Sequence, residues 1–197
     1  MYDWHTLLGI GASVLLIALT IPYIKSILSA ETRPSAVSWS GWALLYAITT
    51  AAQASKGIDW SLAIPLIGTF STASIAIIAL RTGRAAWTRI DRYAIATGVA
   101  AIILWAITRE PLTAIVLSIL ADLAVTMPTY VKTYREPETE PALLWTLYII
   151  GASLEIFATR QLTIYNLLYP LYVLLTDVLI VLFALRAYLP SRRKLRP

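Results

Sequence analysis

The chain contains 197 residues, of which 58% are hydrophobic and only 14% are charged. A soluble domain of this size could not bury so much apolar surface, so the composition excludes an ordinary water-soluble protein. The absence of cysteine and the single histidine exclude disulfides and a Cys/His metal site, so we expect no metal and no cofactor.

Seven apolar segments follow one another along the chain. Runs of about 20 apolar residues predict transmembrane helices, because a helix satisfies its own backbone polar groups in lipid. The predicted spans are Thr6–Leu28, Ser35–Ala54, Trp60–Leu80, Tyr93–Ile107, Pro111–Tyr134, Ala142–Ala158 and Ile164–Tyr188. We therefore expect an all-α membrane protein with seven transmembrane helices and short loops.

The basic residues divide unevenly between the two sides of such a bundle. Seven helices place Lys56, Arg109 and Arg160 on the side of the N-terminus and the other 13 of the 16 basic residues on the opposite side. By the positive-inside rule the richer side faces the cytoplasm, with the N-terminus outside and the C-terminus cytoplasmic. Short loops without a glycosylation sequon favour a prokaryotic inner membrane. We then expect the basic residues behind the net charge of +5 to contact membrane lipids, and we expect no nucleic-acid partner.

Two charged segments of the chain repeat one another. The stretch "YIKSILSAETRP" begins at Tyr23, and "YVKTYREPETEP" begins at Tyr130, an offset of 107 residues. The ends of the third and seventh helices also match, since "ALR" at 79–81 recurs at 184–186 with an offset of 105. Helices one to three therefore correspond to helices five to seven.

Both predicted copies begin on the same side of the membrane, so the repeats are parallel and related by an axis along the membrane normal. A unit of three helices would otherwise insert its second copy upside down, and the unmatched fourth helix restores the orientation. The predicted organisation is a first three-helix repeat (1–81), a linker helix (82–109), a second three-helix repeat (110–189) and a basic cytoplasmic tail (190–197).

This three-plus-one-plus-three plan, with a proline-bearing helix running into a basic loop in each half, resembles the SWEET and PQ-loop superfamily. The corresponding segments are "IPYIKSIL" and "MPTYVKTY", in which Tyr23 and Thr129 follow the prolines where the family often has glutamine. The resemblance covers nearly the whole chain in architecture and implies a seven-helix fold with a solute site between the halves. Vitamin-precursor transporters of the PnuC type share the architecture, as do KDEL receptors, which do not transport.

Prolines and charges gather where the first and fifth helices meet their loops. Proline inside a helix removes a backbone hydrogen bond and kinks it, which gives either a pair of hinges, as the resemblance implies, or static kinks. The charges form either a latch, in which a lysine of one half pairs with a glutamate of the other, or a set of solvated loop charges. The candidate hinge and gate residues are Pro22, Pro128, Lys25, Lys132, Glu31 and Glu138.

Three carboxylates lie within the apolar spans: Asp122, Glu155 and Asp177. An acidic residue at the bilayer centre costs about 2.5–3.5 kcal/mol on insertion scales, so these residues indicate function. In lipid they are protonated, hydrated or facing a cationic or hydroxylated ligand. We expect them to bind solute or to carry a coupled proton.

Other polar residues share helical stripes with these carboxylates. Ser118, Asp122 and Thr126 are spaced four residues apart, and Asp177 corresponds to Thr72 in the repeat. The tryptophans of the second and sixth helices line a solute site or anchor the helices at the membrane interface. The candidate substrate-binding residues are Asp122, Asp177, Glu155, Trp42, Tyr46, Gln53, Trp145, Tyr148 and Thr72.

The sequence contains no nucleophile elbow and no glycine-rich phosphate loop, so we do not expect an enzyme. We expect a transporter of a small polar solute, a uniporter or proton-coupled, that works by alternating access. The expected solute is a sugar, a nucleoside or vitamin, or a cationic compound. The alternatives are a ligand receptor without turnover and a structural or assembly membrane protein, and a homo-oligomer stays open.

Overall fold

In the computed structural model, the described residues are 3–54, 63–82, 89–108 and 111–189, and all regular structure among them is helical. The long helices are α1 (Trp4–Leu28), α2 (Ala36–Ala54), α3 (Ala63–Arg81), α4 (Arg89–Thr108), α5 (Pro111–Arg135), α6 (Ala142–Ala158) and α7 (Ile164–Ala184). Two short 3-10 helices, η2 (Pro137–Thr139) and η3 (Leu185–Tyr188), follow α5 and α7. For the part of the chain that the structure describes, the prediction of an all-α fold with seven long helices is confirmed.

The helix ends lie within four residues of their predicted positions, and the bounds of α6 are those predicted. The predicted start of the third helix at Trp60 and the basic tail at 190–197 lie outside the described residues. Within the described residues, three segments are long and apolar enough to cross a membrane: Trp4–Leu28, Ile115–Arg135 and Ile164–Tyr188. The segments Pro65–Arg81 and Ala142–Ala158 are apolar but shorter.

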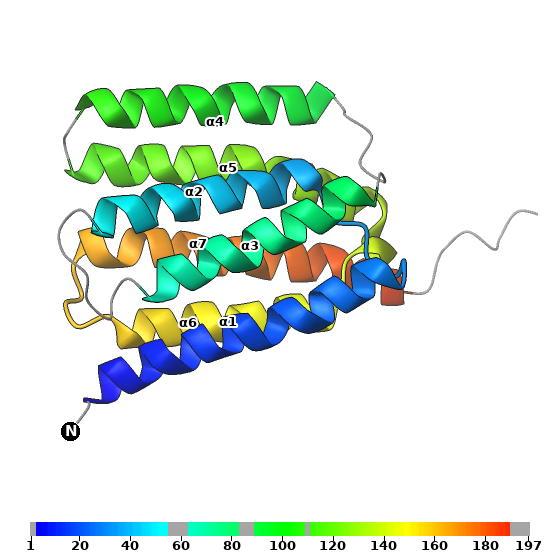
Figure 1. The fold of residues 1–197 in the computed structure, drawn as a ribbon, viewed down its shortest axis with the longest axis horizontal. Coiled ribbons are helices and arrows are strands. Elements are labelled where there is room, and N and C mark those ends of the chain that lie inside the picture. The colour runs from blue at the N-terminus through cyan, green and yellow to red at the C-terminus, as the bar shows by residue number, and fades with distance from the viewer. Residues whose placement is uncertain (1–2, 55–62, 83–88, 109–110, 190–197) are drawn as a thin grey trace, which may run out of the picture.

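The helices lie side by side in one bundle (Figure 1). In the first half of the chain, α3 packs against both α1 and α2, and in the second half α7 packs against both α5 and α6. The halves meet along two seams, one between α1 and α6 and the other between α2 and α5. Helix α4 lies at one edge and packs mainly on α5 (Figure 1).

The bundle is apolar outside and partly polar inside. Large apolar side chains such as Phe70 and Leu175 are 67% and 68% exposed on the outer surface. Inside, Thr126, Thr129 and Thr133 of α5 are fully buried. Small hydroxyl side chains at helix interfaces allow close packing in membranes, and an apolar exterior suits lipid.

Two glycines let α2 approach its neighbours closely. A Cβ atom on Gly41 would lie 2.5 Å from Cγ1 of Val125 in α5. A Cβ atom on Gly68 in α3 would lie 2.6 Å from ring atoms of Tyr46 in α2. Carbon atoms do not approach one another so closely, so these positions require glycine at the present helix separations.

We expect Gly41→Ala to destabilise the protein by about 1–2 kcal/mol, because the cost of overpacking exceeds the gain in helix propensity. Gly11→Ala in α1 is the matched control, since a Cβ there meets no heavy atom within 4 Å. Thermal unfolding in detergent measures both. A Gly41→Ala protein with a melting temperature equal to that of Gly11→Ala would contradict the packing of α2 against α5.

The two loops that carry the repeated motif have different backbones. After α1, Ala30 adopts the left-handed conformation with φ of 67°. The equivalent residue of the second copy, at the offset of 107, is Pro137, which begins η2. Proline cannot reach a positive φ, so the second loop turns through a 3-10 helix instead. The loops still meet, because the Arg33 amide donates to the Thr139 carbonyl at 3.0 Å.

Candidate functional site

A buried carboxylate with three hydroxyl donors lies between α2, α5 and α7. Asp122 of α5 is only 5% exposed. The hydroxyl of Tyr172 donates to its Oδ2 at 2.9 Å, and those of Tyr169 and Thr126 donate at 3.4 Å and 3.3 Å. The Thr126 oxygen in turn accepts from Trp42 Nε1 of α2 at 3.2 Å. We call these five residues the Asp122 cluster.

Local helix geometry explains how the cluster forms. Asp122 and Thr126 are four residues apart on α5, as the predicted stripe required, and therefore face the same direction. The two tyrosines are three apart on α7, with ring centroids 6.0 Å from each other. Sequence reasoning missed both tyrosines, although Tyr169, Tyr172 and Thr176 form a polar stripe with helical spacing.

The other predicted carboxylates lie near this cluster. Asp177 of α7 is 8% exposed. It lies close enough to Asp122 and to Glu155 of α6 for their charges to repel one another. Tyr46 of α2 lies within range of all three carboxylates, and Tyr148 of α6 lies within range of Asp177. Among the described residues, no group of three His, Cys, Asp or Glu side chains is arranged to hold a metal ion. The arrangement offers separate hydrogen-bond acceptors instead.

A group of aromatic rings extends from this region toward one end of the bundle. The centroid of Trp42 lies 5.0 Å from that of Trp39 and 6.1 Å from that of Trp145. Tyr148 follows at 5.5 Å from Trp145. Trp39 and Trp145 are 4% and 3% exposed, so they pack inside the bundle and do not face outward as interfacial anchors.

Two further predicted site residues lie on α3 and α2. Thr72 is buried, and its hydroxyl donates to the Gly68 carbonyl of its own helix at 2.7 Å. In this conformation the Thr72 hydroxyl is therefore hydrogen-bonded within its own helix. Gln53 lies in α2, but its side chain lies outside the described residues.

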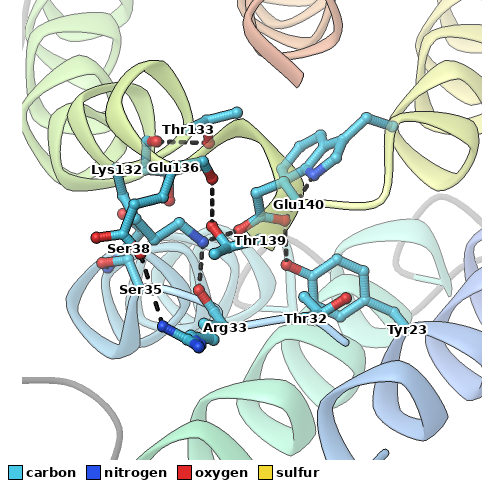
Figure 2. Close-up of polar contacts among 12 residues, drawn as sticks. Tyr23, Thr32, Arg33, Ser35, Ser38, Lys132, Thr133, Glu136, Thr139 and Glu140 are labelled. Carbon is cyan, nitrogen blue, oxygen red and sulfur yellow. Dashed lines mark hydrogen bonds and ion pairs between the residues drawn. The ribbon is translucent and has the colours of Figure 1, made fainter. Parts of the chain in front are cut away.

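A second buried carboxylate, Glu140, lies in the loop before α6 and contacts residues of both halves (Figure 2). Its side chain is 0% exposed and forms an ion pair with Lys132, which is 19% exposed. The Tyr23 hydroxyl and the Trp145 indole nitrogen donate to Oε2 of Glu140 at 2.7 Å and 2.9 Å. Lys132 also donates to the Arg33 carbonyl. We call these five residues the Glu140 network.

The expected gate residues are distributed differently around this end. Pro22 and Pro128 lie within α1 and α5, which continue through them as helices. Lys132 pairs with Glu140, a residue that the sequence analysis did not single out. Lys25, Glu31 and Glu138 are exposed to solvent. Another ion pair at this end does join the two halves: Arg33 and Glu136 lie 3.8 Å apart, and both side chains are more than half exposed.

Among the described residues at the opposite end of the bundle, an exposed ion pair joins the halves. Arg160 pairs with Asp3 at 2.6 Å and donates to Thr6 at 3.3 Å. The Thr6 amide and hydroxyl donate to the Asp3 carboxylate, and these bonds, with the Arg160 charge, lower its pKa. The side chains of Arg160 and Asp3 are 63% and 41% exposed, and exposed ion pairs contribute little to stability.

Comparison with known proteins identified no relative of this chain. No protein-family model matches it, and no curated protein and no solved structure is significantly similar to it. Its function is therefore inferred from the Asp122 cluster, the Glu140 network and the packing of the helices.

Proposed function

We propose that this chain is a membrane transporter for a small polar solute, which passes between the first half (α1–α3) and the second half (α5–α7). The observation that carries the proposal is the Asp122 cluster. A buried carboxylate is costly inside an apolar bundle, and ionisable residues in membrane helices typically serve solute or proton pathways. The cluster also bridges the halves, because Trp42 belongs to α2 and the other four members to α5 and α7.

The helix neighbours support two parallel repeats of the SWEET and PQ-loop kind. Suppose that each helix is exchanged with its counterpart in the other half: α1 with α5, α2 with α6 and α3 with α7. The contact between α1 and α6 then becomes the contact between α5 and α2, which the structure also contains. The same exchange converts α3, packed on α1 and α2, into α7, packed on α5 and α6. This pattern is expected from a pseudo-twofold axis along the membrane normal.

In the proposed arrangement all seven helices cross a prokaryotic inner membrane, and α4 links the two repeats. The N-terminus is outside, and the loops at 29–35 and 136–141 are cytoplasmic, in agreement with the distribution of basic residues. Rocking of the halves about Pro22 and Pro128 then exposes the Asp122 cluster to one side at a time.

The chemistry of the site favours a solute with hydroxyl or cationic groups and an apolar face. Asp122 and Asp177 accept hydrogen bonds or balance a positive charge, and the rings of Trp42 and Tyr148 offer flat surfaces for stacking. A sugar, a nucleoside or vitamin, and an organic cation all meet this description. A proton carried by one of the carboxylates provides coupling, and without it the protein works as a uniporter.

A thermal-shift screen of the detergent-purified protein tests whether the site binds such a solute. A ligand at about 100 times its Kd stabilises the folded state by about 2.7 kcal/mol, which raises Tm by about 5–10 °C. We expect one member of a panel of sugars, nucleosides, vitamins and amines to do so, and Asp177→Asn to weaken the shift. If no member raises Tm at any pH between 5 and 8, the proposal fails and an assembly role is favoured.

A further inference from the structure

We propose that Tyr23 and Glu140 form the gate of the end that contains the loops at 29–35 and 136–141, and that this end opens when the Tyr23 hydroxyl leaves Glu140. The inference gives a mechanism to the proposed transport function and rests on it. Neither residue was a predicted gate residue. The contacts that support the gate are drawn in Figure 2, where Tyr23, Arg33 and Thr32 of one half face Lys132, Thr139 and Glu140 of the other.

The ion pair of this network lies within one half. Lys132 lies in the last turn of α5 and Glu140 precedes α6, so both move with the second half, as does Trp145 of α6. Opening therefore separates no pair of buried charges. It breaks the bond from the Tyr23 hydroxyl to Glu140, the bond from Lys132 to the Arg33 carbonyl, and the backbone bond between Arg33 and Thr139.

Burial makes this gate a two-state element. The Glu140 side chain is fully buried, and a buried carboxylate that loses a donor must regain one from water. Partial separation without water is unfavourable, so the end is either dry and closed or hydrated and open. The exposed pairs Arg33–Glu136 and Asp3–Arg160 lack this property, because water already reaches them.

Two buried hydroxyls lie beside the gate and lack partners in the described structure. Ser38 Oγ of α2 and Thr129 Oγ1 of α5 are fully buried, and neither atom donates or accepts a hydrogen bond among the described residues. Figure 2 labels Ser38 next to Ser35 and Arg33. Water entering through the opened end would hydrate both hydroxyls, which offsets part of the free energy lost at Glu140.

The gate also connects to the Asp122 cluster. Trp145 donates to Glu140 and its ring contacts Trp42, whose nitrogen donates to Thr126, which donates to Asp122. Each contact is a hydrogen bond or a ring contact between neighbouring side chains. A solute that displaces Trp42 from Thr126 therefore disturbs the ring that holds Glu140.

Thiol labelling tests the gate, because the native chain has no cysteine. Ser38→Cys serves as the reporter, and a membrane-impermeant maleimide is applied to the protein in nanodiscs. We expect slow labelling of the reporter alone and labelling about tenfold faster or more when Tyr23→Phe is added, since a hydrogen bond to a charged group is lost. Tyr130→Phe is the matched control, because it is the repeat counterpart of Tyr23 and its ring packs on Phe183.

Further variants separate opening of the gate from general loosening of the bundle. Ser13→Cys, a largely buried reporter on the part of α1 away from the gate, must keep its labelling rate when Tyr23→Phe is added. Glu140→Gln must accelerate labelling at Ser38→Cys as Tyr23→Phe does, whereas Glu138→Gln must not. Unchanged labelling in folded Tyr23→Phe protein would overturn the gate. The labelling experiment needs no solute, so it tests the gate independently of transport. If the gate opens as expected but the protein takes up no solute, the gate stands and only the transport proposal is refuted.

Discussion

Lys132→Met is expected to destabilise the protein by about 3–5 kcal/mol, which lowers Tm by roughly 10 °C. The reason is that Glu140 is fully buried, and removing Lys132 leaves its negative charge without a positive partner. Tyr23 and Trp145 still donate to the carboxylate, but neutral donors do not balance the charge. Thermal unfolding in detergent at neutral pH measures the loss.

Lys25→Met is the matched control for Lys132→Met. Lys25 occupies the equivalent position of the first repeat copy but is exposed, so its replacement changes stability by no more than about 0.5 kcal/mol. The double variant Lys132→Met/Glu140→Gln should recover most of the lost stability, because glutamine requires no counter-charge. Equal melting temperatures for the two lysine variants would show that Lys132 and Glu140 do not form a buried pair.

Asp122→Asn is expected to reduce solute uptake by at least tenfold, since a hydrogen bond to a charged group contributes about 1.5–3 kcal/mol. Asparagine keeps the size of the side chain but removes its charge and turns one acceptor into a donor that faces the Tyr172 or Tyr169 hydroxyl. Tyr172→Phe should weaken uptake less, because it removes one donor and leaves the carboxylate. The measurement is initial uptake into proteoliposomes at equal protein content.

The controls for this prediction change the same groups at exposed positions. Asp3→Asn removes a carboxylate but keeps a good N-cap for α1, and Tyr165→Phe removes an exposed hydroxyl from α7. Both variants should transport like the parent protein. Uptake by Asp122→Asn that equals uptake by Asp3→Asn would remove Asp122 from the proposed site.

The helices were predictable because their signals are local. Apolar runs of helical length set their positions, and Pro34 and Pro141 lie just before α2 and α6, where proline ends the preceding loop. The stripe of Asp122 and Thr126 was predictable for the same reason, since residues four apart share a helix face. The partners of this stripe come from α2 and α7, and no local pattern specifies contacts over such separations.

Residue type and loop position do not distinguish Glu140 from Glu136 and Glu138, which lie in the same loop. Its burial depends on Tyr23 and Trp145, which packing of α1 against α6 brings over it. One sequence signal did point to it. At the offset of 107 the repeat has Arg33 in the first copy and Glu140 in the second, so the two halves carry opposite charges at equivalent positions.

Counterflow in proteoliposomes measures whether solute crosses the membrane between the two halves. Liposomes preloaded with unlabelled glucose, uridine, thiamine or choline receive a trace of the same labelled compound outside. We expect transient accumulation of at least one labelled compound by the parent protein and the loss of this accumulation in Asp122→Asn. A compound that raises Tm through Asp122 yet never accumulates would contradict transport and identify a receptor.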